Sequence, residues 1–208
     1  METQVSTPIA EEILQAAVGL FARKGFEATS TREIVEAAGV TKPMLYYYFK
    51  SKEGLCEAIL NRFLSQFYSR LRLVIDEPRP PRDALVEVVW THLDYCRANR
   101  DFAKFFYSVF FGPDENPLHT VILESTRPGT ELVHEVSTKS AAAGLIDSAK
   151  VEALETALNA MINFWVILTI KEEAEVSREV AVQIVDVLLD GLARRPLGVS
   201  AIPAERSP

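Results

Sequence analysis

A chain of 208 residues with 48% hydrophobic side chains is long enough to bury a sizeable core and has the composition of an ordinary globular protein. Its two cysteines, Cys56 and Cys96, show no CxxC spacing, which argues against a disulfide framework and indicates a reducing, cytoplasmic environment. The net charge of −7 excludes a protein that binds nucleic acid through bulk positive charge, so any such binding must depend on a local surface.

The N-terminal segment predicts a capped helix. Thr7 is placed to cap it, Pro8 occupies the first helical position, where a missing N–H costs nothing, and Gly25 lies just beyond its end. The apolar residues inside it recur at helical spacing and form a buried stripe: Ile13, Leu14, Ala17, Leu20 and Phe21. The role of this helix is therefore mainly to scaffold the helices after it.

Two short helices joined by a tight turn come next. Ser30 caps the first helix, and Glu33 three residues later completes a capping box. Gly39 can take the positive φ that ends a helix and turns the chain. Thr41 is the next N-cap, and Pro43 falls in the first turn of the second helix. The pattern predicts a helix-turn-helix, a motif that places its second helix in the major groove of DNA.

A long helix connects this motif to the rest of the chain. Ser51 caps it, its apolar residues continue at helical spacing to about Asp76, and three prolines between 77 and 82 stop it. The tilt of such a helix sets where the reading helix lies, so it is the natural lever for regulation.

The remaining sequence predicts five more helical segments and no strand, repeat or low-complexity tract. They span Asp83–Arg97, residues 101–112, residues 116–143 with a break or kink at 127–129, Ser148–Lys171 and Ser177–Arg194. The fold is therefore expected to be all-α. A three-helix helix-turn-helix DNA-binding domain covers 1–53 (motif about 30–49), a helical ligand-binding and dimerisation domain covers 54–195, and a disordered Pro-rich tail covers 196–208.

With these elements in place, the sequence resembles the TetR family of bacterial transcriptional regulators. The resemblance rests on the order Gly39-Val-Thr-Lys-Pro43, Leu45-Tyr46-Tyr47-Tyr48-Phe49, Lys50-Ser51-Lys52-Glu53 and Leu55, and extends back through Ile13, Ala16, Leu20, Phe21, Gly25 and Phe26. It covers roughly residues 8 to 60, and it implies a dimeric, ligand-responsive regulator, by default a repressor released from DNA by its effector.

The resemblance also implies which residues contact double-stranded DNA at an inverted-repeat operator. Those facing the groove are Thr41, Lys42, Pro43, Tyr46 and Tyr47; those near the backbone are Tyr48, Lys50, Lys52, Thr31 and Arg32. The alternative for the tyrosines is a buried aromatic cluster, and which of the three reads bases stays open. Residues 1–53 contain six Lys or Arg against seven Glu, a net charge of −1, so the acidic balance of −6 lies in the body. A locally positive face can still bind DNA, with few phosphate contacts.

The last two helices carry apolar arcs wider than one core contact needs. By the resemblance they form a four-helix interface with a second subunit, and the alternative is a deeper monomer core. The predicted interface residues are Leu154, Leu158, Met161, Ile184, Val185, Leu188 and Leu192. Small residues at Ala153, Ala157 and Ala160 offer a second face on the same helix.

Aromatic residues concentrate in the predicted body, above all between Phe102 and Phe111, and indicate a cavity for an apolar or aromatic small molecule. Its predicted lining is Phe63, Phe67, Trp90, His92, Tyr95, Phe106, Phe110, Asn163, Phe164 and Trp165. For any single one of these aromatics, simple core filling is the competing interpretation.

Two other function classes are weighed. Glu131 and His134 match the Glu-x-x-His motif of helical di-iron enzymes, but the motif needs a second copy that the sequence lacks, so a solvated helix face explains it better. We therefore expect neither an enzyme nor a metal or cofactor. A helical small-molecule-binding protein without operator function is the remaining alternative. No signal peptide is visible, and the apolar run from 161 to 170 is too short to span a bilayer.

Overall fold

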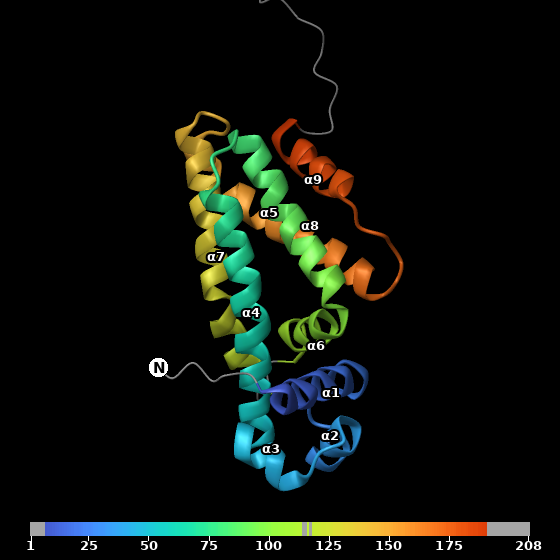
Figure 1. The fold of residues 1–208 in the computed structure, drawn as a ribbon. Helices are drawn as coiled ribbons and strands as arrows, with labels where there is room; N and C mark the ends of the chain where they lie inside the picture. The colour runs from blue at the N-terminus through green and yellow to red at the C-terminus, as the bar shows by residue number, and fades with distance from the viewer. Residues whose placement is uncertain (1–6, 114–115, 117, 191–208) are drawn as a thin grey trace, which may run out of the picture.

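A computed structural model of the chain describes residues 7–113, 116 and 118–190, and every regular element in that part is a helix. The elements are α1 (Pro8–Lys24), α2 (Thr31–Ala38), α3 (Lys42–Phe49), α4 (Lys52–Asp76), α5 (Pro81–Ala98), α6 (Arg100–Phe110), α7 (His119–Ala142), a 3-10 turn (Ser148–Lys150), α8 (Val151–Ile170) and α9 (Arg178–Asp190). Figure 1 shows α1–α3 gathered at one end and α4 running from them into the body beside α7. The all-α prediction is confirmed.

The predicted helix ends are present in the N-terminal domain. The Thr7 side chain accepts the N–H of Ala10, and Gly25 ends α1 with a φ of +82°. Ser30 and Glu33 form the complete capping box of α2, and Gly39 is left-handed, with a φ of +65°. These helix ends are set by local hydrogen bonds and by the positive φ that glycine can adopt. They could therefore be predicted from the sequence.

The joint between α3 and α4 is the tightest point of this domain. Lys50 ends α3 with a φ of +64°, a conformation that side chains other than glycine rarely adopt. Ser51 then caps α4 by accepting the N–H of Gly54. A Cβ added at Gly54 would lie 2.2 Å from the backbone oxygen of Phe49, so only glycine fits there. The orientation of α3 against α4 therefore depends on a close backbone contact.

The body surrounds α5, which packs against α4, α7, α8 and α9, while α6 reaches back to α1 (Figure 1). Of the break or kink predicted at 127–129, the break is absent, because α7 continues through Pro128 as one helix. Tyr68 of α4 supports it there: the Tyr68 hydroxyl donates to the backbone oxygen of Ser125 at 2.7 Å, and its ring lies 2.9 Å from where Gly129 would carry a Cβ. Tertiary contact thus offsets the local cost of a proline inside the helix.

The predicted dimer contacts need a correction, because four of them are buried within one chain. Leu154, Leu158, Ile184 and Val185 have exposed fractions of 1–8%. Helix α8 needs one apolar face for its own core, and the residues at 154 and 158 belong to that face. Met161 and Leu188 keep partial exposure, and the residue at 192, like the predicted tail, lies outside the described residues.

A different face of α8 is apolar and uncovered. It consists of five residues three or four positions apart: Ala153, Ala157, Ala160, Phe164 and Leu168. Phe164 is 59% exposed, and the others are exposed or half-buried. Residues 148–171 are also the one stretch of the described chain long and apolar enough to cross a membrane by length and composition, with 22% of the most apolar window buried.

Candidate functional site

The outer face of α3 presents the residues predicted to meet DNA. Tyr47 is 74% exposed and Tyr46 39% exposed. Thr41, Lys42 and Pro43 are exposed at the start of the helix. Thr41 takes the N-cap position, but its hydroxyl makes no capping hydrogen bond and so stays available to another acceptor or donor.

The inner face of α3 holds the helix to the domain. Leu45 and Phe49 are buried, as the sequence predicted. Tyr48 is half-buried against the core and meets the ring of Tyr47 edge-on, with 5.1 Å between ring centroids. Of the three tyrosines, Tyr47 is therefore the most exposed and Tyr48 the one most committed to packing.

The cations beside α3 fall into two groups. Lys42 and Lys50 are exposed, and the Lys50 ammonium lies 3.3 Å from the backbone oxygen of Tyr47. Arg32 of α2 is exposed and pairs with Glu36 one turn later at 2.8 Å. Lys52 is different, because its ammonium donates to the backbone oxygens of Phe26 and Thr29 at 2.9 and 3.2 Å. Lys52 therefore holds the α1–α2 turn to the start of α4.

The two carboxylates of α2 are paired as well. Glu33 accepts from Lys24 and from the backbone and hydroxyl of Ser30, and these contacts lower the pKa of Glu33 to about 2. Arg32 and Glu36 neutralise each other on the surface. The acidic residues of α2 are thereby engaged locally, which reduces their repulsion of an approaching phosphate.

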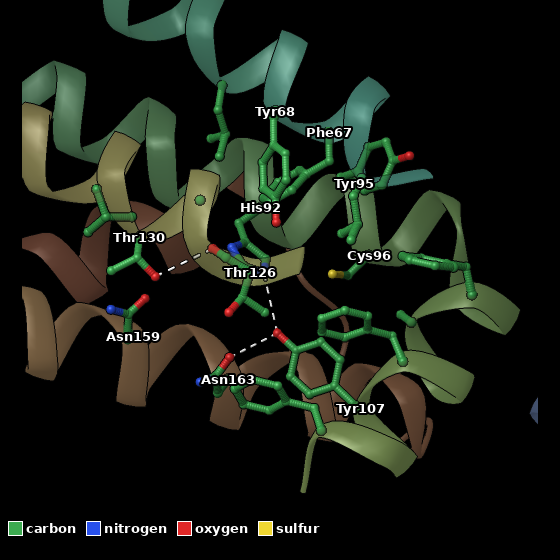
Figure 2. A pocket seen from close by; sticks show the side chains of 18 residues that line it. Phe67, Tyr68, His92, Tyr95, Cys96, Tyr107, Thr126, Thr130, Asn159 and Asn163 are labelled. Carbon is green, nitrogen blue, oxygen red and sulfur yellow. Dashed lines mark hydrogen bonds between the residues drawn. The ribbon is translucent and has the colours of Figure 1, made fainter. Parts of the chain in front are cut away.

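A cavity of about 280 Å³ lies in the body, enclosed by α4, α5, α6, α7 and α8 (Figure 2). Its lining comprises Leu64, Phe67, Tyr68, Leu71, His92, Tyr95, Cys96, Phe102, Ala103, Phe106, Tyr107, Phe110, Thr126, Gly129, Thr130, Val133, Asn159 and Asn163. The volume is at the lower end of the range for small-molecule pockets, and the lining is mostly apolar.

Six of the ten predicted lining residues border this cavity: Phe67, His92, Tyr95, Phe106, Phe110 and Asn163. The structure places the other four elsewhere. Phe63 is buried and stacks on Phe102 with 4.5 Å between ring centroids. Trp90, Phe164 and Trp165 lie on other sides of α5 and α8, because neighbouring residues of a helix point about 100° apart. Closeness in sequence to a lining residue therefore does not predict that an aromatic residue lines the cavity.

The sequence-based prediction of the lining included no residue of α7 and omitted Tyr107. Thr126 and Thr130 reach the cavity from α7, and Asn159 reaches it from α8 one turn before Asn163. Tyr107 was available as a signal, because a tyrosine on the buried side of an aromatic helix needs a partner for its hydroxyl. The α7 threonines carried no such signal, since only tertiary packing turns that side of α7 inward.

Tyr107 is the centre of a buried polar network (Figure 2). Its hydroxyl donates to Oδ1 of Asn163 at 2.9 Å and lies 3.3 Å from Nε2 of His92. Burial raises the pKa of Tyr107 well above its ordinary value and lowers the pKa of His92 to about 4. The surface that His92 keeps accessible borders the cavity. At neutral pH all three side chains are therefore uncharged.

The two cysteines and the residues of the Glu-x-x-His motif have structural surroundings. Cys56 and Cys96 are buried free cysteines, and burial raises the pKa of each thiol to about 12. His134 pairs with Glu155 at 2.9 Å on the surface, and Glu131 pairs with an arginine of its own helix. Within the described part of the chain, no three His, Cys, Asp or Glu side chains gather as metal ligands would.

Known proteins resemble the two halves of this chain to different extents. Residues 13–59 match the family described as bacterial regulatory proteins, tetR family. The transcriptional repressor KstR2 of Mycolicibacterium smegmatis is 37% identical over 75 residues, 36% of this chain. The match spans only 37% of the length of that repressor.

Solved structures match over a longer stretch but at lower identity. A putative fatty acid metabolism regulator of Clostridium perfringens has a TM-score of 0.79 at 21% identity, covering 88% of this chain and all of its own. FadR of Bacillus subtilis, in complex with stearoyl-CoA, has a TM-score of 0.77 at 19% identity, covering 88% and 99%. At these identities they establish the fold of the body and nothing of its ligand. The N-terminal domain of this chain therefore resembles the DNA-binding domain of the tetR family of bacterial regulatory proteins, and the helix-turn-helix geometry of α2 and α3 agrees with that match.

Proposed function

We propose that this protein is a dimeric transcriptional repressor that binds an inverted-repeat operator and is released by a small, mainly apolar molecule. The observation that carries the proposal is the path from α3 to the cavity. Helix α4 begins at the joint with α3, and further along it Leu64, Phe67, Tyr68 and Leu71 line the cavity. One rigid element thus joins the reading surface to the place where an effector binds.

The reading surface is suited to a small number of DNA contacts. The exposed tyrosines and Thr41 supply hydroxyls for phosphates and base edges, and Lys42 can reach a guanine edge. Thr31, Arg32 and Lys50 lie beside them as backbone contacts. Lys52 contributes by positive charge alone, because its hydrogen bonds are used inside the domain.

Tyr68 supports the coupling of effector and DNA. It borders the cavity, donates to the α7 backbone and packs closely on Gly129. A ligand that fills the space between α4 and α7 must contact or displace this side chain. By shifting α4 against α7, such a ligand favours one separation of the two reading helices over others and so changes DNA affinity.

The uncovered face of α8 is the proposed subunit interface. Small residues at 153, 157 and 160 allow close approach of a second helix, and Phe164 supplies apolar area. A two-fold dimer places two α3 helices on a palindromic site. Burial by a second copy also accounts for the apolar character of residues 148–171 without a membrane, in keeping with a cytoplasmic protein. The proposed function needs no cofactor and no catalytic residue.

The test is selection of bound fragments from the source genome by the purified protein, followed by fluorescence anisotropy on the enriched site. We expect an inverted repeat, and we expect Tyr47→Ala to weaken its binding by roughly tenfold or more, the loss of about one good contact. Glu57→Ala, an exposed change on α4, is the control and should leave affinity unchanged. A folded dimer that enriches no sequence would instead favour a helical binding protein without operator function.

A further inference from the structure

The lining of the cavity contains no permanently charged side chain. Among its described residues there is no Lys, Arg, Asp or Glu. The groups that can ionise are three tyrosines, His92 and Cys96, and burial keeps them neutral: it raises the pKa of Tyr68, Tyr95 and Cys96 to about 12 and lowers that of His92 to about 4. An ionised group inside this cavity would have no partner of opposite charge.

The hydrogen bonds of the Tyr107 network leave one donor group unused. The Tyr107 hydroxyl has one proton, and the shorter contact, 2.9 Å to Oδ1 of Asn163, takes it. The Tyr107 oxygen then accepts from Nε2 of His92 at 3.3 Å. Asn163 lines the cavity with its oxygen engaged, and no described residue accepts from its NH2 group. The network therefore fixes Asn163 as a donor.

Asn159 adds a second amide at the entrance. It lies one turn before Asn163 on the same face of α8, is exposed, and has no protein partner among the described residues. Opposite it on α7, the hydroxyls of Thr126 and Thr130 donate to carbonyls of their own helix. Figure 2 shows Asn159 and Thr130 on one side of the cavity, with Asn163, Tyr107 and His92 beyond them.

We propose that the effector is an uncharged molecule with an apolar body and a hydrogen-bond acceptor, a carbonyl oxygen, that binds the Asn163 amide. This inference rests on the proposed function, because it concerns the ligand of the same cavity. The apolar body lies among Phe67, Phe102, Phe106 and Phe110, which line the cavity. A carboxylate in the same place loses its hydration without gaining a cation, so its affinity is lower by at least about two orders of magnitude.

A neutral carbonyl can come from a free amide, ketone or ester, or from the thioester of an acyl-coenzyme A. In the second case only the acyl part and the thioester enter, because a cavity of about 280 Å³ is at the lower end for a small ligand and lacks cations for phosphates. The two sources share the group that Asn163 binds and differ in whether the coenzyme adds affinity outside the cavity.

The experiment is calorimetric titration of the full-length protein, without DNA, with decanamide, decanoic acid and decanoyl-coenzyme A. At about pH 8 we expect decanamide to bind at least about 100-fold more tightly than decanoate, which is fully ionised there. Towards about pH 5 the acid should gain affinity as it becomes protonated, while decanamide stays constant. Tighter binding of the thioester than of the amide identifies the coenzyme-linked source, and equal or weaker binding identifies the free one.

Two variants test the role of Asn163. Asn163→Leu keeps the size of the side chain and should weaken decanamide about tenfold, the loss of one hydrogen bond. Asn61→Leu makes the same change on the exposed side of α4 and should have no effect. Decanoate binding as tightly as decanamide at about pH 8, or no decanamide binding by the folded protein, would overturn the inference.

These results are separable from a failure of the proposed function. Operator binding with release by decanoate would support the proposed regulator and contradict the proposal of a neutral ligand. Selective decanamide binding by a protein that enriches no DNA would support the proposed ligand class and contradict the proposed regulator.

Discussion

His92 makes the stability of this protein depend on pH in a defined window. Burial lowers its pKa from 6.5 to about 4, so the folded state holds the imidazole neutral where the unfolded chain protonates it. Between these two values the unfolded state binds more protons, and the free energy of unfolding therefore falls as the pH falls. Across the whole window the loss amounts to about 3 kcal/mol per chain, taking about 1.4 kcal/mol for a tenfold change in proton affinity.

The assay compares urea unfolding of the wild type and His92→Gln at a fixed protein concentration, in steps from about pH 7 to about pH 4. Glutamine can still donate to the Tyr107 oxygen, but it does not titrate. Glu33 and the other carboxylates titrate in both proteins, so the difference between the two curves isolates His92. We expect the wild type to lose about 3 kcal/mol more than the variant over this range, with little further divergence below about pH 4.

Parallel curves for the two proteins would contradict the prediction that burial lowers the pKa of His92. They would mean that His92 is protonated as readily in the folded state as in the unfolded chain. The imidazole resonances give a direct check. The chain has three histidines, and the signal missing from His92→Gln identifies the one whose midpoint should lie near pH 4.

The remaining predictions concern the joint, the interface and the coupling. Gly54→Ala should lower the free energy of unfolding by about 1–3 kcal/mol and reduce operator affinity, because its Cβ meets a backbone oxygen at 2.2 Å. Gly19→Ala should be tolerated in the same denaturation assay, because its Cβ would meet only the ends of two flexible side chains, the Arg23 guanidinium at 3.2 Å and the Asp101 carboxylate at 3.6 Å. Phe164→Glu should give monomers in analytical ultracentrifugation, whereas Leu73→Glu, also at an exposed apolar residue, should stay dimeric. If both variants are dimeric, the interface lies elsewhere. Tyr68→Phe removes the hydrogen bond to α7 and should alter the effector-induced change in DNA affinity more than DNA affinity itself; an unchanged response would remove Tyr68 from the coupling.

The local geometry of the N-terminal domain could be predicted from the sequence because short-range contacts decide it. Ser30 and Glu33 bond to each other's backbone within one turn, and Gly39 takes a conformation that few other residues adopt. The long helix also ended at Asp76 as predicted, because the prolines after it cannot continue it. In these places the residues that determine the structure are within four positions of the structure they determine.

The apolar faces of the C-terminal helices could be predicted from the sequence, but which face is buried in the chain and which is exposed could not. Periodicity shows that α8 has more apolar surface than one contact needs, yet it cannot say which face lies inside. The fold buries Leu154 and Leu158 inside the chain and leaves Phe164 exposed. Both faces are apolar and recur at the same helical spacing, so only packing against the other helices separates core from candidate interface.

The sequence was enough to predict the class of this protein: an all-α chain with a capped helix-turn-helix and an aromatic-rich helical body. The position and lining of the cavity depend on the tertiary structure. It joined Tyr107, His92 and Asn163 from three helices, brought Thr126 and Thr130 into the lining, and engaged Lys52 inside the domain. The physical reason is distance along the chain: caps and periodicity act within a few residues, whereas a cavity is the space left where five helices meet.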